Sequence, residues 1–486
     1  MTAAPLSFAP AAPVPTARPA LALLPPTRLP LWYFGVAHLS LIVALAVVAV
    51  DPRGVSGFYY HPRMLGVVHL VTLGWITGAI LGAIRIVAPL VLRVSIPVTR
   101  GDYWALSFVA IGMSGMVSHF WLETFSGMAW SAGMVVLGLV HVVTRLLVRL
   151  RCATIDRPIA AHLWLACLNL LAAGTVGVLI AVDKVTDVLP GDALSNVYAH
   201  AHLAAVGWAS MMVVGIGYRL LPMVLPSAVP RGRGLYGSAI LLEAGLIGLV
   251  ITLVTGWPGA SLFALAIVIG FLVFLGQVVW MTRHRRTPPA ARARPDFGAI
   301  QAGHALVYLV LAAGCGVLLV ATPTSASTPP LVMLYGVFGL VGFLAQLVVA
   351  MELRLLPLLA WYAHFAARGF TAPDLSTHVL PAQPVAAVAF AGWVVGLPVL
   401  ARGLAMDRPA WVAAGAGVLL VAVVVQTGHA VWMLRPLRQS PALASGSSSD
   451  RGGAMPAALT PLYVKTHVQA ACATSSRART SVMTRW

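Results

Sequence analysis

Long apolar segments separated by short polar loops make up most of this chain. Each is about 20 residues long with few charges, the length that crosses a bilayer core as an α-helix. Because the runs are continuous rather than alternating, they favour helices over a transmembrane barrel. We therefore expect an all-α polytopic membrane protein whose twelve transmembrane helices cover residues 31–50, 64–91, 103–122, 127–149, 160–182, 197–225, 236–256, 260–282, 298–321, 331–359, 383–401 and 410–434.

Composition and charge agree with this class. Of the 486 residues, 59% are hydrophobic and only 9% are charged, whereas a soluble domain has about a quarter charged residues. The net charge of +18 comes from arginines that cluster in alternate loops, which is the positive-inside pattern. We expect a multi-pass protein of the inner (cytoplasmic) membrane, with both termini cytoplasmic, the lipid bilayer as its partner and no nucleic acid.

The two ends of the chain differ from its centre. Residues 1–28 are rich in Pro and Ala, and residues 437–486 are rich in Ser, Ala, Gly and Arg, so we expect disordered cytoplasmic segments there and a transmembrane domain over 29–436. The four cysteines include no C-x-x-C pair. They therefore predict neither a disulfide nor a thiolate metal site.

A repeat runs through the transmembrane domain. Residues 69–89, 202–222 and 337–357 align without a gap, and glycine, aromatic and proline positions coincide in all three. These coincidences are Gly74, Gly207 and Gly342; Trp75, Trp208 and Phe343; and Pro89, Pro222 and Pro357. We infer three parallel four-helix repeats, about 29–150, 151–286 and 296–436, arranged as a pseudo-threefold ring.

Histidines are the candidate ligands. His69 and His202 occupy the same position in the first two repeats, and neutral imidazole is the commonest metal ligand. His200 lies about 200° from His202 around a regular helix, so both cannot face one metal. We take His69 and His202 as the main candidates, ahead of His200, His38, His119 and His304. For each, a hydrogen-bonded packing role is the alternative.

Other polar positions have two interpretations each. Arg85, Arg219 and Arg354 lie at nearly equivalent positions. We favour snorkelling anchors there over contacts with a carboxylate or a propionate. Glu243 is either a proton relay or a neutral hydrogen-bonded acid. The glycines at 82 and 215 allow close approach of a flat macrocycle or of another helix.

The architecture resembles subunit I of the haem–copper oxidase superfamily, and "HAHLAAVGWASMMVVGIGYRLLP" resembles the NnrS family of twelve-span membrane haem and copper proteins. The resemblance implies that His69 binds a haem, of b type, and that His202 or His200 binds copper. The sequence also departs from the oxidases. Val337 stands where they have a span-10 ligand, and span 7 has no histidine pair, so the usual dioxygen-reducing set is incomplete.

The resulting hypothesis is a membrane haem protein, with or without copper, that handles electrons or a diatomic gas (O2 or NO). An electron-donor protein would be its partner, and an oxidoreductase activity stays open, as does the oligomeric state. Two alternatives remain. One is a transporter or metal permease that uses the histidines as a proton or metal relay, and the other is an assembly partner of an oxidase.

Overall fold

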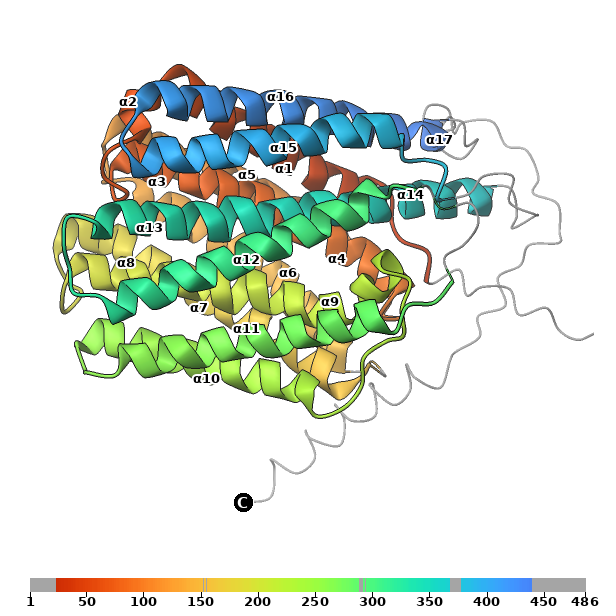
Figure 1. Cartoon of the computed structure of the whole chain (residues 1–486), viewed down its shortest axis with the longest axis horizontal. Helices are drawn as coiled ribbons and strands as arrows, with labels where there is room; N and C mark the ends of the chain where they lie inside the picture. The colour runs from red at the N-terminus through yellow and green to blue at the C-terminus, as the bar shows by residue number, and fades with distance from the viewer. Residues whose placement is uncertain are drawn as a thin grey trace, which may run out of the picture.

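The structure is a computed structural model that describes residues 23–151, 153, 155–287, 292, 294–367 and 377–438. Those residues form 12 helices long and apolar enough to cross a membrane, and they contain no β-strand. The long helices lie side by side along one direction (Figure 1). The predicted all-α polytopic fold is therefore confirmed. The segments predicted to be disordered, 1–28 and 437–486, lie outside the described residues apart from their inner edges.

Each repeat contains four long helices, and the second of them is built from three consecutive pieces. The first repeat consists of α1 (Arg28–Val50), the short α2 (Pro52–Val55), α3 (Pro62–His69), the π-helix η2 (Leu70–Thr77), α4 (Gly78–Leu90), α5 (Arg100–Leu122) and α6 (Met128–Arg151). The second consists of α7 (Arg157–Thr186), α8 (Ala193–His202), the π-helix η3 (Leu203–Ser210), α9 (Met211–Val224), α10 (Gly234–Thr255) and α11 (Ala260–Arg283). The third consists of α12 (Phe297–Ala321), α13 (Thr328–Gly336), the π-helix η4 (Val337–Ala345), α14 (Gln346–Ala367), α15 (Gln383–Ala405) and α16 (Pro409–Met433), followed by α17 (Arg435–Arg438).

The three-piece helices form the centre of the bundle, and we call them the first, second and third inner helix. Their π-helical segments contact one another. The last two helices of each repeat pair closely, as α5 with α6, α10 with α11 and α15 with α16, and α1 packs on α16 to close the ring. The first two inner helices are 72% buried over their most apolar stretch, whereas α11 and α12 are 28% buried there. The outer helices thus present their apolar side chains outward, as expected of a lipid-facing layer.

The π-helical segments occupy equivalent places in the repeat. In a π-helix the backbone hydrogen bonds join residues i and i+5. Such segments often mark functional positions. η2 begins directly after His69 and η3 directly after His202, while η4 begins at Val337. The three segments end at the aligned positions Thr77, Ser210 and Ala345. This shared irregularity supports the three-repeat organisation.

Polar caps explain where several helices begin. The Asp192 side chain accepts a hydrogen bond from the Ser195 N–H and starts α8 at Ala193, a few residues before the predicted 197. Asp296 caps α12 through the Ala299 N–H in the same way. These side chains satisfy backbone donors that a helix start leaves free. At the other end, α14 continues past Pro357 to Ala367 rather than ending near 359.

Two repeat glycines serve helix packing. A Cβ at position 215 would lie 2.5 Å from the His162 Cβ on α7, and one at position 82 would lie 3.0 Å from the Tyr33 Cβ on α1. The inner helix therefore touches the first helix of its own repeat at these glycines, as small residues allow in membranes. Of the two interpretations, close approach of a helix is the one that the structure shows.

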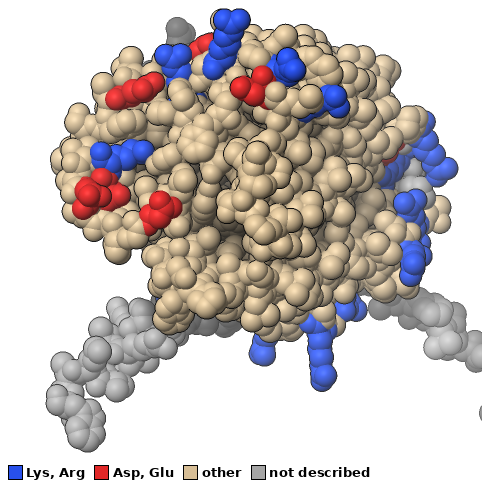
Figure 2. Space-filling model, turned by 60° about the vertical axis from the view of Figure 1, so that its left-hand side comes forward, with Lys and Arg blue, Asp and Glu red and all other residues tan. Residues whose placement is uncertain are grey.

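The two ends of the bundle differ in chemistry. The histidine end, on the left of Figure 1, is where α3 and α8 begin, and the arginine end is where α4 and α9 finish. In the view turned toward the histidine end, charged side chains gather in groups near the edges of a largely uncharged surface (Figure 2).

Candidate functional site

A cavity of about 330 Å³ lies toward the histidine end, enclosed by the inner helices, α5, α6 and α7. We call it the histidine cavity. Its size falls in the range of small-molecule and cofactor sites, and its lining is mostly apolar, as is typical of them. Its polar lining includes His69, His200, His202, Lys184, Tyr60, Tyr198, Tyr335, Thr72 and Thr77.

His69 and His200 are close neighbours in this cavity. Their ring centroids are 6.4 Å apart and their planes are inclined by 23°. The Nδ1 of His69 is 2.7 Å from the Leu65 carbonyl, and the Nδ1 of His200 is 3.0 Å from the Ala173 carbonyl. A carbonyl oxygen only accepts, so each Nδ1 carries the proton and each Nε2 keeps a free lone pair. Metal-binding histidines are usually oriented by this kind of second hydrogen bond.

His202 lines the same cavity but faces a different neighbour. Its Nδ1 donates to the Tyr198 carbonyl at 2.7 Å, and its Nε2 accepts from the Tyr335 hydroxyl of α13 at 3.2 Å. Both ring nitrogens are therefore engaged. The structure brings His69 together with His200, which sequence reasoning ranked lower, and directs His202 toward the third repeat. The opposite directions of His200 and His202 agree with their expected angular separation.

The α7 wall of the cavity consists of small residues, which are Ala173, Gly174, Gly177 and Ala181. A Cβ at Gly177 would lie 3.0 Å from the Cε1 of His200. The missing side chain therefore leaves the His200 ring its place against α7. A bulkier residue there would displace the imidazole from the position in which it neighbours His69.

The side chain of Lys184 lines the cavity at the histidine end of the bundle. The Lys184 ammonium, in the last turn of α7, donates to the Tyr60 hydroxyl at 3.1 Å and lies 4.9 Å from the Phe125 ring centroid. None of the ion pairs found within the described ranges gives it a carboxylate partner. Sequence reasoning missed Lys184 and Tyr335 as cavity residues. The rarity of lysine in the membrane domain could have identified the former, whereas no sequence signal marks the latter.

The other candidate histidines lie outside this cavity. His38 lies between Thr427 and Glu352, and its two ring nitrogens are 2.8 Å and 3.3 Å from their side-chain oxygens. The Nδ1 of His304 is 2.8 Å from the Gln346 side-chain oxygen. The Nδ1 of His119 is 2.6 Å from the Thr124 carbonyl at the end of α5. All three are hydrogen-bonded outside the histidine cavity, and a ligand role for them stays a prediction.

Glu243 lies on α10, away from the cavity lining. Its carboxyl oxygen accepts a hydrogen bond from the Asn169 side chain at 2.8 Å, and the residue is half-buried. It is therefore a hydrogen-bonded acid at the interface of α7 and α10. A role in proton transfer stays a prediction for this residue.

Each arginine of the repeat contacts an aspartate near the arginine end. Arg85 pairs with Asp102 at 2.7 Å in a fully buried position, and Arg219 pairs with Asp156 at 2.7 Å in an exposed one. Arg354 pairs with Asp296, which Arg292 also contacts. Contact with a carboxylate, the less favoured of the two interpretations, is therefore what the structure shows. These pairs lie at the far end of the bundle from the histidine cavity.

No group of three or more His, Cys, Asp or Glu side chains within the described residues is placed to hold a metal ion. Protein-only sites for zinc or copper use three or four such ligands. Buried Cys167 and Cys315 are free thiols. What the cavity offers is two imidazole lone pairs, one ammonium group and apolar walls, which suit a largely apolar ligand with a metal and an anionic group.

No protein-family model and no curated protein matches this chain. The residues of the cavity are therefore the basis for assigning a function.

Proposed function

We propose that the histidine cavity binds a haem through His69 and His200, and that the protein is a membrane haem protein that transfers electrons or binds a diatomic gas. The observation that carries the proposal is the neighbouring pair of imidazoles whose Nδ1 atoms donate to backbone carbonyls. An imidazole nitrogen lies about 2.0–2.1 Å from a metal that it ligates. Two rings with centroids 6.4 Å apart are close enough to share one ion.

The ligand count favours haem over a protein-only metal centre. Since no third acidic, thiol or imidazole group joins the pair among the described residues, the remaining ligands would have to come from a cofactor. A haem supplies four ring nitrogens and needs only axial protein ligands. Copper at His202 stays the second element of the hypothesis, and it would require the Tyr335 hydrogen bond to be exchanged for a metal bond.

The rest of the cavity fits the shape and charge of such a cofactor. Glycine and alanine on α7 leave room beside His200. Lys184 and Tyr60 would face the carboxylates of the cofactor at the histidine end, because a cation without a carboxylate partner binds an anionic group favourably. The chain's own residues thus hold, orient and partly neutralise the ligand.

The number of imidazoles that would hold the cofactor decides which activity it would support. If both His69 and His200 were to bind it, the chemistry supplied would be electron transfer with a donor protein. If only one were to bind it, the chemistry supplied would be binding of O2 or NO. The resemblance to oxidase subunit I and to the NnrS family supports either use, as does the expected place in the inner membrane.

The visible spectrum of the purified protein tests this proposal. We expect a Soret band with α-bands on reduction, and loss of that spectrum in the H69A and H200A variants. H119A is the matched control, because His119 lies at the same end of the bundle but outside the cavity lining. Carbon monoxide should shift the reduced spectrum only if a coordination position is open.

Two results would redirect the assignment. Loss of the spectrum in H202A with retention in H200A would make His202 the second ligand. A colourless protein with neither iron nor copper, in all preparations, would exclude the haem protein and favour the transporter, in which the same histidines would relay protons or metal ions.

A further inference from the structure

A buried acid–base pair lies between the first and third repeats. Neither of its residues lines the histidine cavity. The Nε2 of His38 on α1 is 3.3 Å from the Oε1 of Glu352 on α14. Their side chains are 7% and 4% exposed. Sequence reasoning did not single out Glu352, although a carboxylate in a transmembrane helix marks a functional position by default.

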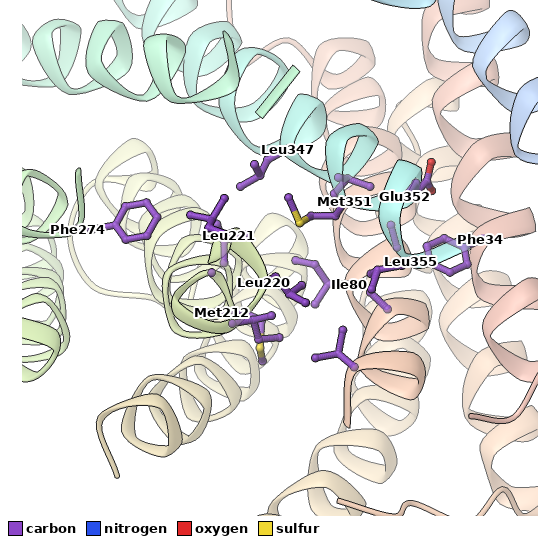
Figure 3. A pocket seen from close by; sticks show the side chains of 17 residues that line it. Phe34, Ile80, Met212, Leu220, Leu221, Phe274, Leu347, Met351, Glu352 and Leu355 are labelled. Atoms are coloured by element: carbon purple, nitrogen blue, oxygen red, sulfur yellow. The ribbon is translucent and has the colours of Figure 1, made fainter. Parts of the chain in front are cut away.

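Figure 3 shows the surroundings of Glu352. An apolar cavity of about 70 Å³ lies on the axis between the inner helices, and the Glu352 side chain contributes to its wall. The carboxylate oxygens are turned away from the middle of that cavity. They are directed instead to the contact of α1 with α16, where Gln426 donates to Oε2 at 3.2 Å.

Hydrogen bonding around His38 fixes its tautomer. The Thr427 hydroxyl donates its only hydrogen to the Val423 carbonyl at 2.7 Å. Thr427 must therefore accept from the His38 Nδ1, 2.8 Å away, so that Nδ1 carries a proton. The proton on the opposite nitrogen, Nε2, is the variable one, and Nε2 is the atom that faces Glu352.

The pair is electrically neutral when it holds one proton between these two atoms. The proton is either on Nε2, facing the Glu352 carboxylate, or on the carboxyl group, facing the Nε2 lone pair. Neither Nε2 nor Oε1 makes a hydrogen bond within the described residues, so the 3.3 Å contact between them is what each has. Loss of that proton leaves a buried negative charge and two lone pairs facing each other, and gain of a second proton leaves a buried positive charge. Uncompensated charges of either sign are costly inside a membrane.

The other repeats provide an internal comparison. The first helices of the second and third repeats also carry a histidine, at other positions along the helix, since His162 lies against Gly215 where the first repeat has Tyr33 against Gly82. The side-chain partners of His162 and His304 are Ser238 and Gln346. Both partners are neutral. Among the histidines of the three first helices, the combination of imidazole and carboxylate is therefore found at His38.

Nearby charged groups are already paired elsewhere. Tyr33 on α1 has a buried hydroxyl without a hydrogen-bond partner in the described part of the chain. Four other groups on the helices packed against the pair have contacts of their own. The paired ones are Arg85 with Asp102, Arg354 with Asp296, His304 with Gln346, and His429 with the Ala382 N–H. These groups therefore do not serve as counter-ions to His38 or Glu352.

We propose that His38 and Glu352 form a buried binding site for one exchangeable proton. The proton is taken up onto the Nε2 or the carboxylate and released to solvent from the same two atoms, and no oxidant or reductant is involved. The site does not depend on a cofactor in the histidine cavity. A proton is thus stored in the membrane interior at the contact that joins the first and third repeats.

Infrared difference spectra of the full-length protein in lipid nanodiscs, recorded between about pH 5 and about pH 10 in H2O and D2O, test this proposal. We expect a carboxyl or carboxylate band that changes with pH, shifts in D2O and is lost in E352Q. In H38Q the band should persist at a shifted frequency, because the carboxyl group loses its imidazole partner. E243Q, which changes the carboxylate on α10, should leave the band unchanged.

Glutamine has nearly the shape of glutamate, and the His304–Gln346 contact shows a glutamine beside an imidazole elsewhere in the bundle, so we expect E352Q to fold. The size-exclusion elution and the thermal transition of E352Q should match those of the unaltered protein. If they do not, E352D is measured instead, and its infrared band should be shifted rather than lost. The proposal is overturned if E352Q removes no pH-dependent band, if the band does not exchange in D2O, or if H38Q leaves it unchanged.

Discussion

The aspartate contacts of Arg85 and Arg219 show how burial changes the contribution of an ion pair to the free energy of unfolding. Asp102 is fully buried, and Arg85 and Arg145 both contact it. Breaking a buried pair leaves an uncompensated charge and costs several kcal/mol, whereas an exposed pair contributes about 0–1 kcal/mol. The side chains of Arg219 and Asp156 are 33% and 55% exposed, so this pair belongs to the second class.

Arg85→Ala should therefore lower the free energy of unfolding by about 3 kcal/mol, with Arg145 limiting the loss. Arg219→Ala, at the equivalent edge of the second repeat, should lower it by less than about 1 kcal/mol. Unfolding of both variants in mixed detergent micelles gives the comparison. Equal effects would contradict the assigned role of burial.

Asp296 gives a pH-dependent contact outside the membrane-spanning segments. Burial raises the pKa of its carboxyl, but Arg354, Arg292 and the Ala299 N–H outweigh it and hold the pKa below its ordinary value. Because the pKa of this carboxyl is lower in the folded than in the unfolded protein, ionised Asp296 stabilises the fold at pH values above its unfolded pKa of about 3.9. This stabilisation is lost as the pH falls through the folded pKa. The carboxylate is thus a stabilising group at neutral pH and not in strong acid.

Asp296→Asn should accordingly be less stable than the unaltered protein above about pH 4, by about 1–3 kcal/mol. The difference in the free energy of unfolding between the two proteins should shrink as the pH falls below that value. Measuring both proteins side by side cancels the other carboxyl groups. A difference that stays constant down to about pH 2 would show that the aspartate does not stabilise through its charge.

At the scale of elements, the three inner helices depend on close packing at glycines. A Cβ at position 215 would lie 2.5 Å from the His162 Cβ, so Gly215→Ala requires the inner helix and α7 to separate, at a cost of about 1–3 kcal/mol. Gly276 on α11 is exposed, and a Cβ added there would meet no atom of a neighbouring element within 4 Å. Gly276→Ala should instead stabilise by about 0.5–1 kcal/mol through helix propensity.

Opposite signs for these two alanine substitutions, measured by thermal unfolding in one detergent, would support the packing role of Gly215. If both variants gain stability, the first helix and the inner helix of the second repeat are not in the close contact described.

Much of the fold was predictable because its signals are local. The length and polarity of each apolar run decide the number of spans, and the coincidence of Gly207 with its repeat equivalents reveals the repeat. The choice between His200 and His202 was not local. It depends on how the second inner helix is turned relative to α3 and α7, and repeat equivalence favoured His202 although His200 is the neighbour of His69.

The π-helical segments and the acid–base pair were missed for related reasons. Apolar residues such as those of Leu203–Ser210 have no composition that distinguishes a π-helix from an α-helix. Glu352 stands two residues before the repeat arginine Arg354, while its partner His38 comes from the first helix of the chain. Contacts between distant segments require the packing to be known.

At the scale of the whole molecule, the positive-inside pattern predicts an orientation. With the arginine end cytoplasmic, a cysteine introduced at exposed Ser325, between α12 and α13, should react with a membrane-impermeant maleimide in intact cells. A cysteine at exposed Arg231, between α9 and α10, should react only after lysis. Both changes are made in a variant that lacks the native cysteines. The reverse labelling would place the histidine end in the cytoplasm.

The histidine cavity is shared by the three repeats, since His69 belongs to the first, His200 to the second and Tyr335 to the third. A chain that ends before α13 would therefore carry both imidazoles without the wall that bears Tyr335. Enclosure of a ligand in this cavity thus requires the whole transmembrane chain.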